Sequence, residues 1–193
     1  MRELVEVMVV KKLCLRVLSN SVEQMLVKSV TKLIVMAFKP LYALKIVNRV
    51  KDCEVRTYFG NIERNDLVLI YASSPRKAFL GIFRVLDIAV GYYDDIVSYL
   101  RKGCKFFDED NWHFIEEHYS KSWRKLMVIK IGDVKAFPRE APLHEVRKYI
   151  PSYRPPLSYV QASHELVSVL KQILGASVWE DIITKLSKGE FHQ

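Results

Sequence analysis

Short apolar runs, separated by charged turns and by turns with Gly or Pro, fill the middle of this chain of 193 residues. Runs of this length, rich in Val, Ile, Phe and Tyr, are typical of β-strands. They predict strands at 33–40, 53–60, 67–73, 78–88 and 125–137. Gly81, inside the fourth run, indicates a bulge or a close approach of two backbones.

Segments with helical periodicity interrupt these strands. They lie at 41–50, 94–102, 108–119 and, as a short helix or turn, 141–149. Because the helices are short and the strands form one compact unit, the pattern favours a small α+β barrel over βαβ repeats. A Pro-rich segment at 150–159 closes this unit.

The final segment, 161–193, is predicted to be a helical hairpin. Ser163 can cap its first helix, Gly175 can end it, and Ser177 with Glu180 forms a capping box for the second. A helix-turn-helix would use that second helix to read DNA. Glu180 and Asp181 lie at the start of this helix and would repel the phosphates. We therefore expect the hairpin to pack against the core or against the N-terminal helix.

The first segment, 1–35, reads as an extension of the barrel unit. A capping box at Ser21 predicts a helix, while 4–18 suits a strand or a helix equally. A translation start at Met25 or Met36 is the alternative for this part of the chain. The predicted parts are therefore 1–35, 36–160 and 161–193.

Charge adds a candidate partner to this picture. The formal net charge is +8, and most of it lies between residues 36 and 156. A basic surface favours an anionic partner such as nucleic acid. Many basic proteins simply stay soluble in this way, so charge alone leaves both interpretations open.

Cysteine and histidine usage argues against a metal site or a cofactor. Cys14, Cys53 and Cys104 are odd in number and far apart, which favours a reducing cytoplasm over a disulfide framework. His113 and His118 are five residues apart and cannot share a helix face. No apolar run reaches the length of a membrane span.

Four segments follow one another in order within 36–160. They are FKPLYALKIV (38–47), VKDCEVR (50–56), LVLIYASSPRKAFLGIFRV (67–85) and RPPLSY (154–159). Together they resemble the ASCH domain of the PUA-like superfamily, most closely its small archaeal members. The resemblance implies a small, mostly antiparallel β-barrel with a cleft beside its first helix. It also implies a protein that binds RNA or a modified nucleobase.

Strand parity locates one wall of this cleft. Side chains alternate along a strand, so Glu54 and Arg56 share one face while Cys53 and Val55 face the core. Lys51 has the parity of the apolar face and must swing back from the turn before the strand. An exposed ion pair of little energetic value is the plain alternative. The family pattern Lys-x-x-Glu-x-Arg favours a cleft-lining triad, in which Glu54 accepts from the exocyclic amine of a base.

The Ser-Ser-Pro loop is the expected opposite wall. Ser73, Ser74, Arg76 and Lys77 offer hydroxyls, backbone amides and cations that suit a phosphate, although a plain Ser-Pro turn is the alternative. The family resemblance also implies that Lys39 lies on this side of the cleft. Four aromatic residues could stack on an unpaired base, although each alone is more often a core residue: Tyr42, Tyr58, Phe59 and Tyr71. The segment HYSKSWR (118–124) is a further basic and aromatic surface.

Two other functions stay open beside RNA or nucleobase binding. Some ASCH proteins are amidohydrolases acting on N4-acetylcytidine. The resemblance to them implies that Lys51 would be the base or nucleophile of such a reaction in this chain. These amidohydrolases have Thr at the position of Glu54. They also have a further acidic residue, for which Asp87 is the candidate in this chain. The third function is a non-catalytic module that contacts a protein partner, or a second copy of itself, through the terminal helices.

Overall fold

A computed structural model describes residues 31–58, 60, 62–104 and 109–188. The helix predicted after Ser21 and the ambiguous segment 4–18 lie outside these residues. So does Phe59, one of the four candidate stacking residues. The expected division at 35 and 36 falls inside the first strand, which begins at Leu33.

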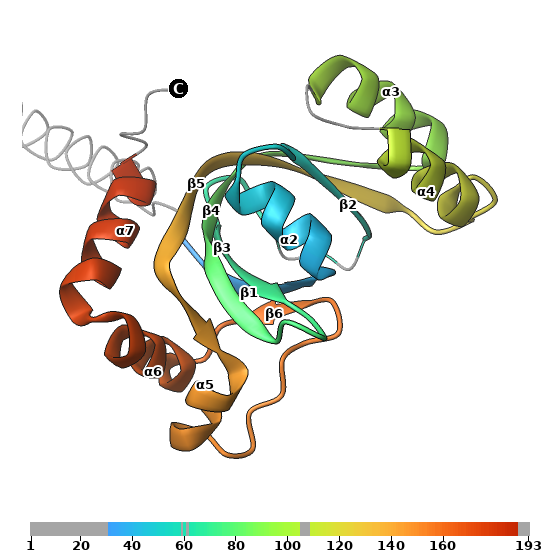
Figure 1. The fold of residues 1–193 in the computed structure, drawn as a ribbon. Helices are drawn as coiled ribbons and strands as arrows, with labels where there is room; N and C mark the ends of the chain where they lie inside the picture. The colour runs from blue at the N-terminus through green and yellow to red at the C-terminus, as the bar shows by residue number, and fades with distance from the viewer. Residues whose placement is uncertain (1–30, 59, 61, 105–108, 189–193) are drawn as a thin grey trace, which may run out of the picture. The chain divides into compact units, whose positions relative to one another are not determined.

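Six strands form one curled sheet that wraps around helix α2 (Pro40–Val47), as Figure 1 shows. The strands are β1 (Leu33–Phe38), β2 (Cys53–Thr57), β3 (Leu67–Ala72), β4 (Ala78–Gly91), β5 (Leu126–Pro142) and β6 (Tyr159–Gln161). Their order is β2-β5-β4-β3-β1-β6, and among these pairs only β1 and β3 run parallel. The predicted α+β class, with a mostly antiparallel barrel-like sheet, is confirmed.

The five predicted strands are present, but their bounds differ and a sixth strand was not predicted. β5 continues through Pro138 to Pro142, beyond the expected end at residue 137, although proline cannot donate to a sheet. Register shifts between β4 and β5 accommodate this segment. β6 is a strand of three residues that starts at the end of the Pro-rich segment and is too short to be recognised by periodicity.

Gly81 lies where the backbones of the paired strands β4 and β5 approach each other closely. A Cβ at this position would lie 2.4 Å from the carbonyl oxygen of Lys135, and the register of β4 shifts on both of its neighbours nearby. Both expectations for Gly81, a bulge and a close backbone approach, are therefore confirmed.

We expect Gly81→Ala to destabilise the protein by about 2 kcal/mol, because the clash is with a backbone oxygen that cannot move without disturbing the sheet. Urea denaturation measures this change. Gly103→Ala is the matched control, since its nearest contacts, to the Tyr99 ring, begin at 3.6 Å. Equal stability of the two variants would contradict the close approach.

Helices cover both faces of the sheet. Ala43 and Ile46 of α2 pack inside the curl with Met36 and Phe83. Helices α5 (Leu143–Tyr149), α6 (His164–Leu174) and α7 (Ala176–Lys188) pack on the other face, in one core with β1 and β3. None of the helices in the described part of the chain is long and apolar enough to cross a membrane.

The C-terminal hairpin packs against the core, as its acidic second helix suggested. Ser163 caps α6, because its hydroxyl accepts the backbone N–H of Leu166 at 3.2 Å. The second capping box is wrong: α7 begins at Ala176, so Ser177 already lies inside its first turn. Trp179 and Leu186 of α7 are buried. Partner binding or self-association through this hairpin stays a prediction.

Candidate functional site

A cavity of about 500 Å³ opens beside the N-terminus of α2. It is bounded by the ends of β1 and β3, by β2, by the β3–β4 loop, by helices α4 (Glu109–Tyr119) and α5, and by the Pro-rich segment. Its polar and aromatic lining residues are Lys39, Tyr42, Glu54, Arg56, Tyr71, Ser73, Ser74, Lys77, Phe114, Tyr119 and Arg147. We call it the cleft.

Glu54 and Arg56 form one wall of the cleft. Arg56 Nε lies 2.8 Å from Glu54 Oε1, an ion pair whose angle is too poor for a hydrogen bond. The same guanidinium donates to the carbonyl of Ala37 and covers the Phe38 ring, 5.1 Å from its centroid. Glu54 is only 7% exposed, so this is not the exposed ion pair that was the plain alternative.

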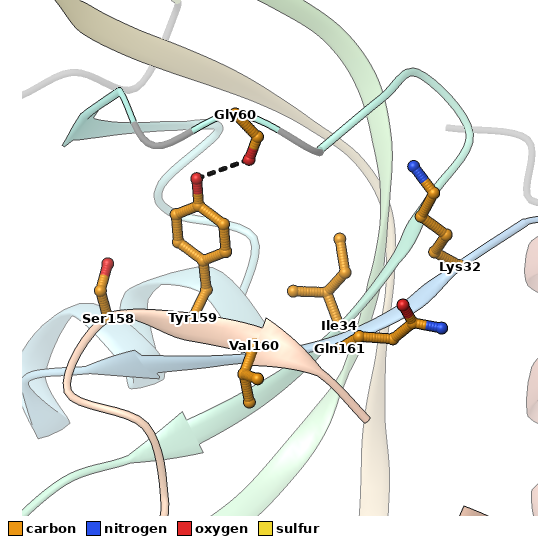
Figure 2. A pocket seen from close by; sticks show the side chains of 7 residues that line it. All are labelled: Lys32, Ile34, Gly60, Ser158, Tyr159, Val160 and Gln161. Atoms are coloured by element: carbon orange, nitrogen blue, oxygen red, sulfur yellow. Dashed lines mark hydrogen bonds between the residues drawn. The ribbon is translucent and has the colours of Figure 1, made fainter. Parts of the chain in front are cut away.

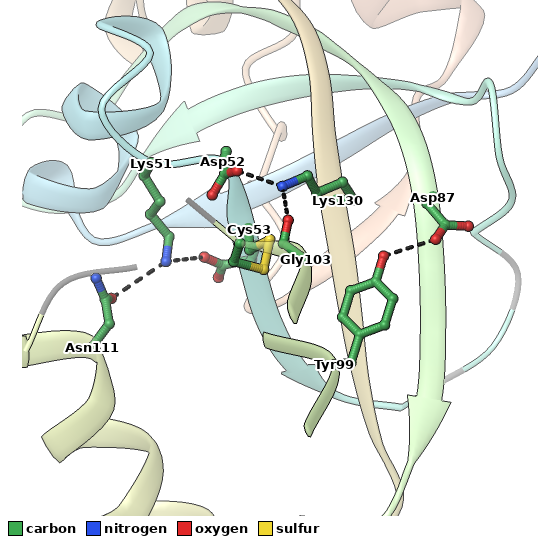
Figure 3. Close-up of a disulfide and its surroundings, with 10 residues drawn as sticks. Lys51, Asp52, Cys53, Asp87, Tyr99, Gly103, Asn111 and Lys130 are labelled. Carbon is green, nitrogen blue, oxygen red and sulfur yellow. Dashed lines mark hydrogen bonds and ion pairs between the residues drawn. A yellow bond between two sulfur atoms is a disulfide. The ribbon is translucent and has the colours of Figure 1, made fainter. Parts of the chain in front are cut away.

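Lys51 lies beneath this wall and not in the cleft itself. It does swing back from the turn before β2, as strand parity required: its Nζ lies 3.5 Å from Glu54 Oε2. Nζ also donates to Asn111 Oδ1 of α4 at 3.3 Å, as Figure 3 shows. The ammonium is 5.3 Å from the centroid of the Tyr42 ring. It lines a small adjoining pocket of about 40 Å³.

The β3–β4 loop forms the opposite wall. Ser73, Ser74 and Lys77 line the cleft, and the peptide bond between Ser74 and Pro75 is cis. The Ser73 backbone N–H donates to Phe38 and that of Lys77 donates to Ser73, so the loop is anchored to the end of β1. Lys39 is exposed at the rim, 5.2 Å from the centroid of the Phe114 ring.

Of the four loop residues predicted to line the cleft, Arg76 points away from it. Its guanidinium pairs with Glu140 of β5, with Nε 2.9 Å from Oε1, and it is not among the residues that line the cleft. The reason is local: β5 runs beside the loop, since Ala78 pairs with Pro142. The sequence could not show this neighbour.

No protein-family model and no curated protein sequence matches this chain. Solved structures do. The ASCH protein of Zymomonas mobilis has a TM-score of 0.62 at 21% identity, over 74% of this chain and 96% of that chain. Two single-residue variants of the same protein also give 0.62 at 20% identity, over 74% of this chain and 96% and 98% of theirs. This chain has the ASCH fold.

The ASCH fold confirms the PUA-like architecture that four sequence segments had suggested. At this identity the likeness is one of fold, and a fold hosts many functions. The function must therefore be argued from the cleft. The kinship to archaeal members stays a prediction.

Sequence reasoning missed the contribution of α4 to the cleft. Asn111 and Phe114 are three residues apart and so lie beside each other on the helix, and both line the small pocket with Tyr119 and with residues of β2 and α2. Burial raises the pKa of Tyr119 and of Tyr71, the latter at the end of β3, so both phenols lose their protons only at a higher pH than an exposed tyrosine does. The helical spacing was the available signal, but it does not reveal which partner a face meets.

Arg147 of α5 also lines the cleft and was not predicted. Asp87, the guessed acid of the hydrolase alternative, accepts from the Tyr99 hydroxyl at 2.8 Å and does not line the cleft (Figure 3).

A disulfide joins Cys53 to Cys104, so the prediction against a disulfide is wrong (Figure 3). The two residues are 51 positions apart, but β2 runs beside the end of α3 (Tyr93–Gly103), with a Cα–Cα distance of 6.0 Å. Lys130 of β5 strengthens the same contact, since its ammonium pairs with Asp52 and donates to the Gly103 carbonyl. Cysteine usage therefore no longer favours a reducing cytoplasm, and the cytoplasmic location stays a prediction.

The apolar face of β2 also has an unexpected neighbour. Cys53 and Val55 do not face the inside of the curl: they pack with Ile96, Leu100 and Ile115 of α3 and α4. Parity separated the two faces of β2 correctly. It could not say that the apolar one would be covered by two helices inserted between β4 and β5.

A second cavity, of about 630 Å³, lies between β6 and Gly60 (Figure 2). The Tyr159 hydroxyl donates to the Gly60 carbonyl at 2.8 Å across it. Among the residues described as lining it, only Lys32 is charged. It offers fewer convergent polar groups than the cleft, which is therefore the better candidate site.

Proposed function

We propose that the cleft binds a nucleobase, either unpaired in RNA or as a free modified nucleoside. The observation that carries this proposal is the pairing of two walls across one cavity. The Glu54–Arg56 wall and the Ser73, Ser74 and Lys77 wall line the same 500 Å³ space. That volume lies within the usual range for small-ligand sites.

The groups in the cleft match the parts of a nucleotide. Glu54 has carboxylate lone pairs beyond those used by its ion pairs, and these can accept from an exocyclic amine. Phe114 and Tyr119 offer rings on which an unpaired base can stack. Lys39 and Lys77 are exposed cations at the mouth, where a phosphate can reach them without leaving water.

The hydrolase alternative has less support. Lys51 would have to reach the substrate, but its Nζ is engaged by Glu54 and Asn111 and opens on a space of about 40 Å³. A nucleoside does not fit there, and Asp87 is not at hand to assist. Incubation with N4-acetylcytidine tests this alternative, and deacetylation by the wild type that Lys51→Met abolishes would support it.

We expect Lys39→Ala and Lys77→Ala each to weaken the binding of labelled tRNA up to about tenfold, and to reduce the slope of log affinity against log salt by about one. Filter binding at several salt concentrations measures both quantities. Lys185→Ala is the matched control: it removes the same charge from α7, where Lys185 pairs with Asp181.

The outcomes separate a cleft from diffuse attraction. A loss confined to the two cleft variants supports the proposal. Equal losses in all three variants would mean that tRNA senses only net charge, and absence of binding by the wild type would exclude RNA as the ligand. Free nucleosides can be tested on the same variants by calorimetry.

A further inference from the structure

Three neighbouring strands end together beside α3 and α4. Leu126, the first residue of β5, pairs with Thr57 on one side and with Gly91 on the other. The next residues outward are therefore Tyr58, Lys125 and Tyr92, side by side. The Tyr58 backbone N–H donates to the Lys125 carbonyl at 2.9 Å, and Lys125 Nζ lies 6.0 Å from the centroid of the Tyr92 ring.

Trp123 and Arg124 extend this row. Trp123 is 81% exposed, Tyr92 53% and Tyr58 44%, which is unusual for large aromatic side chains. The Arg124 guanidinium lies 5.4 Å from the centroid of the Trp123 ring. We call Tyr58, Tyr92, Trp123, Arg124 and Lys125 the aromatic-basic edge.

Among the residues that the structure describes, no carboxylate neutralises the cations of the aromatic-basic edge. In the described part of the chain, neither Arg124 nor Lys125 forms an ion pair with a carboxylate. Asp95 accepts the Tyr92 backbone N–H at 3.1 Å. Exposed rings flanked by unpaired cations make a surface that suits an anion with flat apolar faces.

We infer that the aromatic-basic edge binds single-stranded nucleic acid by stacking bases on Trp123 and Tyr92 while Arg124 and Lys125 meet the phosphates. This inference rests on the proposed function of the cleft and extends it to the neighbouring nucleotides of the same strand. Stacking needs unpaired bases, because the faces of paired bases are covered by their neighbours. A duplex would reach only the two cations.

The position of the edge fits this extension. Tyr119 lines the cleft at the end of α4, and its carbonyl accepts the backbone N–H of Ser122, one residue before Trp123. On β2, Arg56 also lines the cleft, and it lies two residues before Tyr58. A nucleic-acid strand whose base enters the cleft thus finds the edge within a few residues of Arg56 and of Tyr119, which both line the cleft.

The test uses a labelled single strand of twelve uridines and fluorescence anisotropy with the full-length protein. We expect Trp123→Ala to weaken binding about tenfold, the usual order for loss of one stacked base. Trp123→Phe keeps a ring and should retain most of the affinity. Tyr149→Ala is the matched control, because Tyr149 on α5 is also 50% exposed but lies in neither the edge nor the cleft. A duplex of the same length should bind more weakly and be insensitive to Trp123→Ala.

Failure of this inference can be told from failure of the cleft proposal. If Trp123→Ala binds like Tyr149→Ala while Lys77→Ala binds weakly, the edge is overturned and the cleft stands. If Trp123→Ala binds weakly while Lys39→Ala and Lys77→Ala bind like the wild type, the cleft is overturned. Equal sensitivity of the duplex to Trp123→Ala would overturn stacking.

Discussion

Glu54→Ala is expected to destabilise the protein by about 3–5 kcal/mol, the usual cost of removing one partner of a buried ion pair. Glu54 is the carboxylate that both Lys51 and Arg56 contact, and Lys51 is only 4% exposed. Without Glu54, the Lys51 ammonium keeps Asn111 and the Tyr42 ring but loses its counter-charge in a place that water scarcely reaches. Urea denaturation measures the loss.

Two further variants make this result specific. Glu180→Ala breaks an exposed pair with Lys171 and should cost less than about 1 kcal/mol. The double variant Lys51→Met/Glu54→Leu removes two buried charges together and should recover part of the loss. If Glu54→Ala costs no more than Glu180→Ala, the triad is not a buried charge cluster.

Reduction of the disulfide between Cys53 and Cys104 is expected to remove about 2–4 kcal/mol of stability. The bond closes a loop of 51 positions, so its loss frees the unfolded chain and makes unfolding more favourable. For a protein of this size the melting temperature should fall by roughly 5–10 °C. Thermal unfolding with and without a reductant measures the shift.

The double variant Cys53→Ala/Cys104→Ala is the control for this experiment. It should melt near the temperature of the reduced wild type and should not respond to the reductant. A wild type whose melting temperature does not move, although thiol counting shows that the bond is broken, would contradict the stabilising role.

Much of the local structure could be predicted from the sequence. The five strand segments and the cap at Ser163 depend on residues near one another in the chain, and a glycine inside a strand pattern indicated the close approach at Gly81. The shared face of Glu54 and Arg56 followed from strand parity, since side chains alternate whatever the rest of the fold does. The return of Lys51 toward Glu54 was expected from the family pattern, with Lys51 in the turn before the strand.

The candidate site was less accessible. Glu54, Arg56 and the serines of the loop line one cavity, but Lys51 lies below it and Arg76 turns to Glu140. Helix α4 brings Phe114 and Tyr119, and α5 brings Arg147, which sequence patterns did not connect with β2.

The sequence by itself thus determined which segments are strands and helices and which side chains share a face. These properties arise from backbone geometry over a few residues. Only the tertiary structure decided what each face meets: that Cys53 reaches Cys104, that Val55 packs under α3 and α4, and that three strand ends gather Tyr58, Lys125 and Tyr92. Those neighbours are distant in the chain, and contacts of that kind depend on how the whole sheet curls.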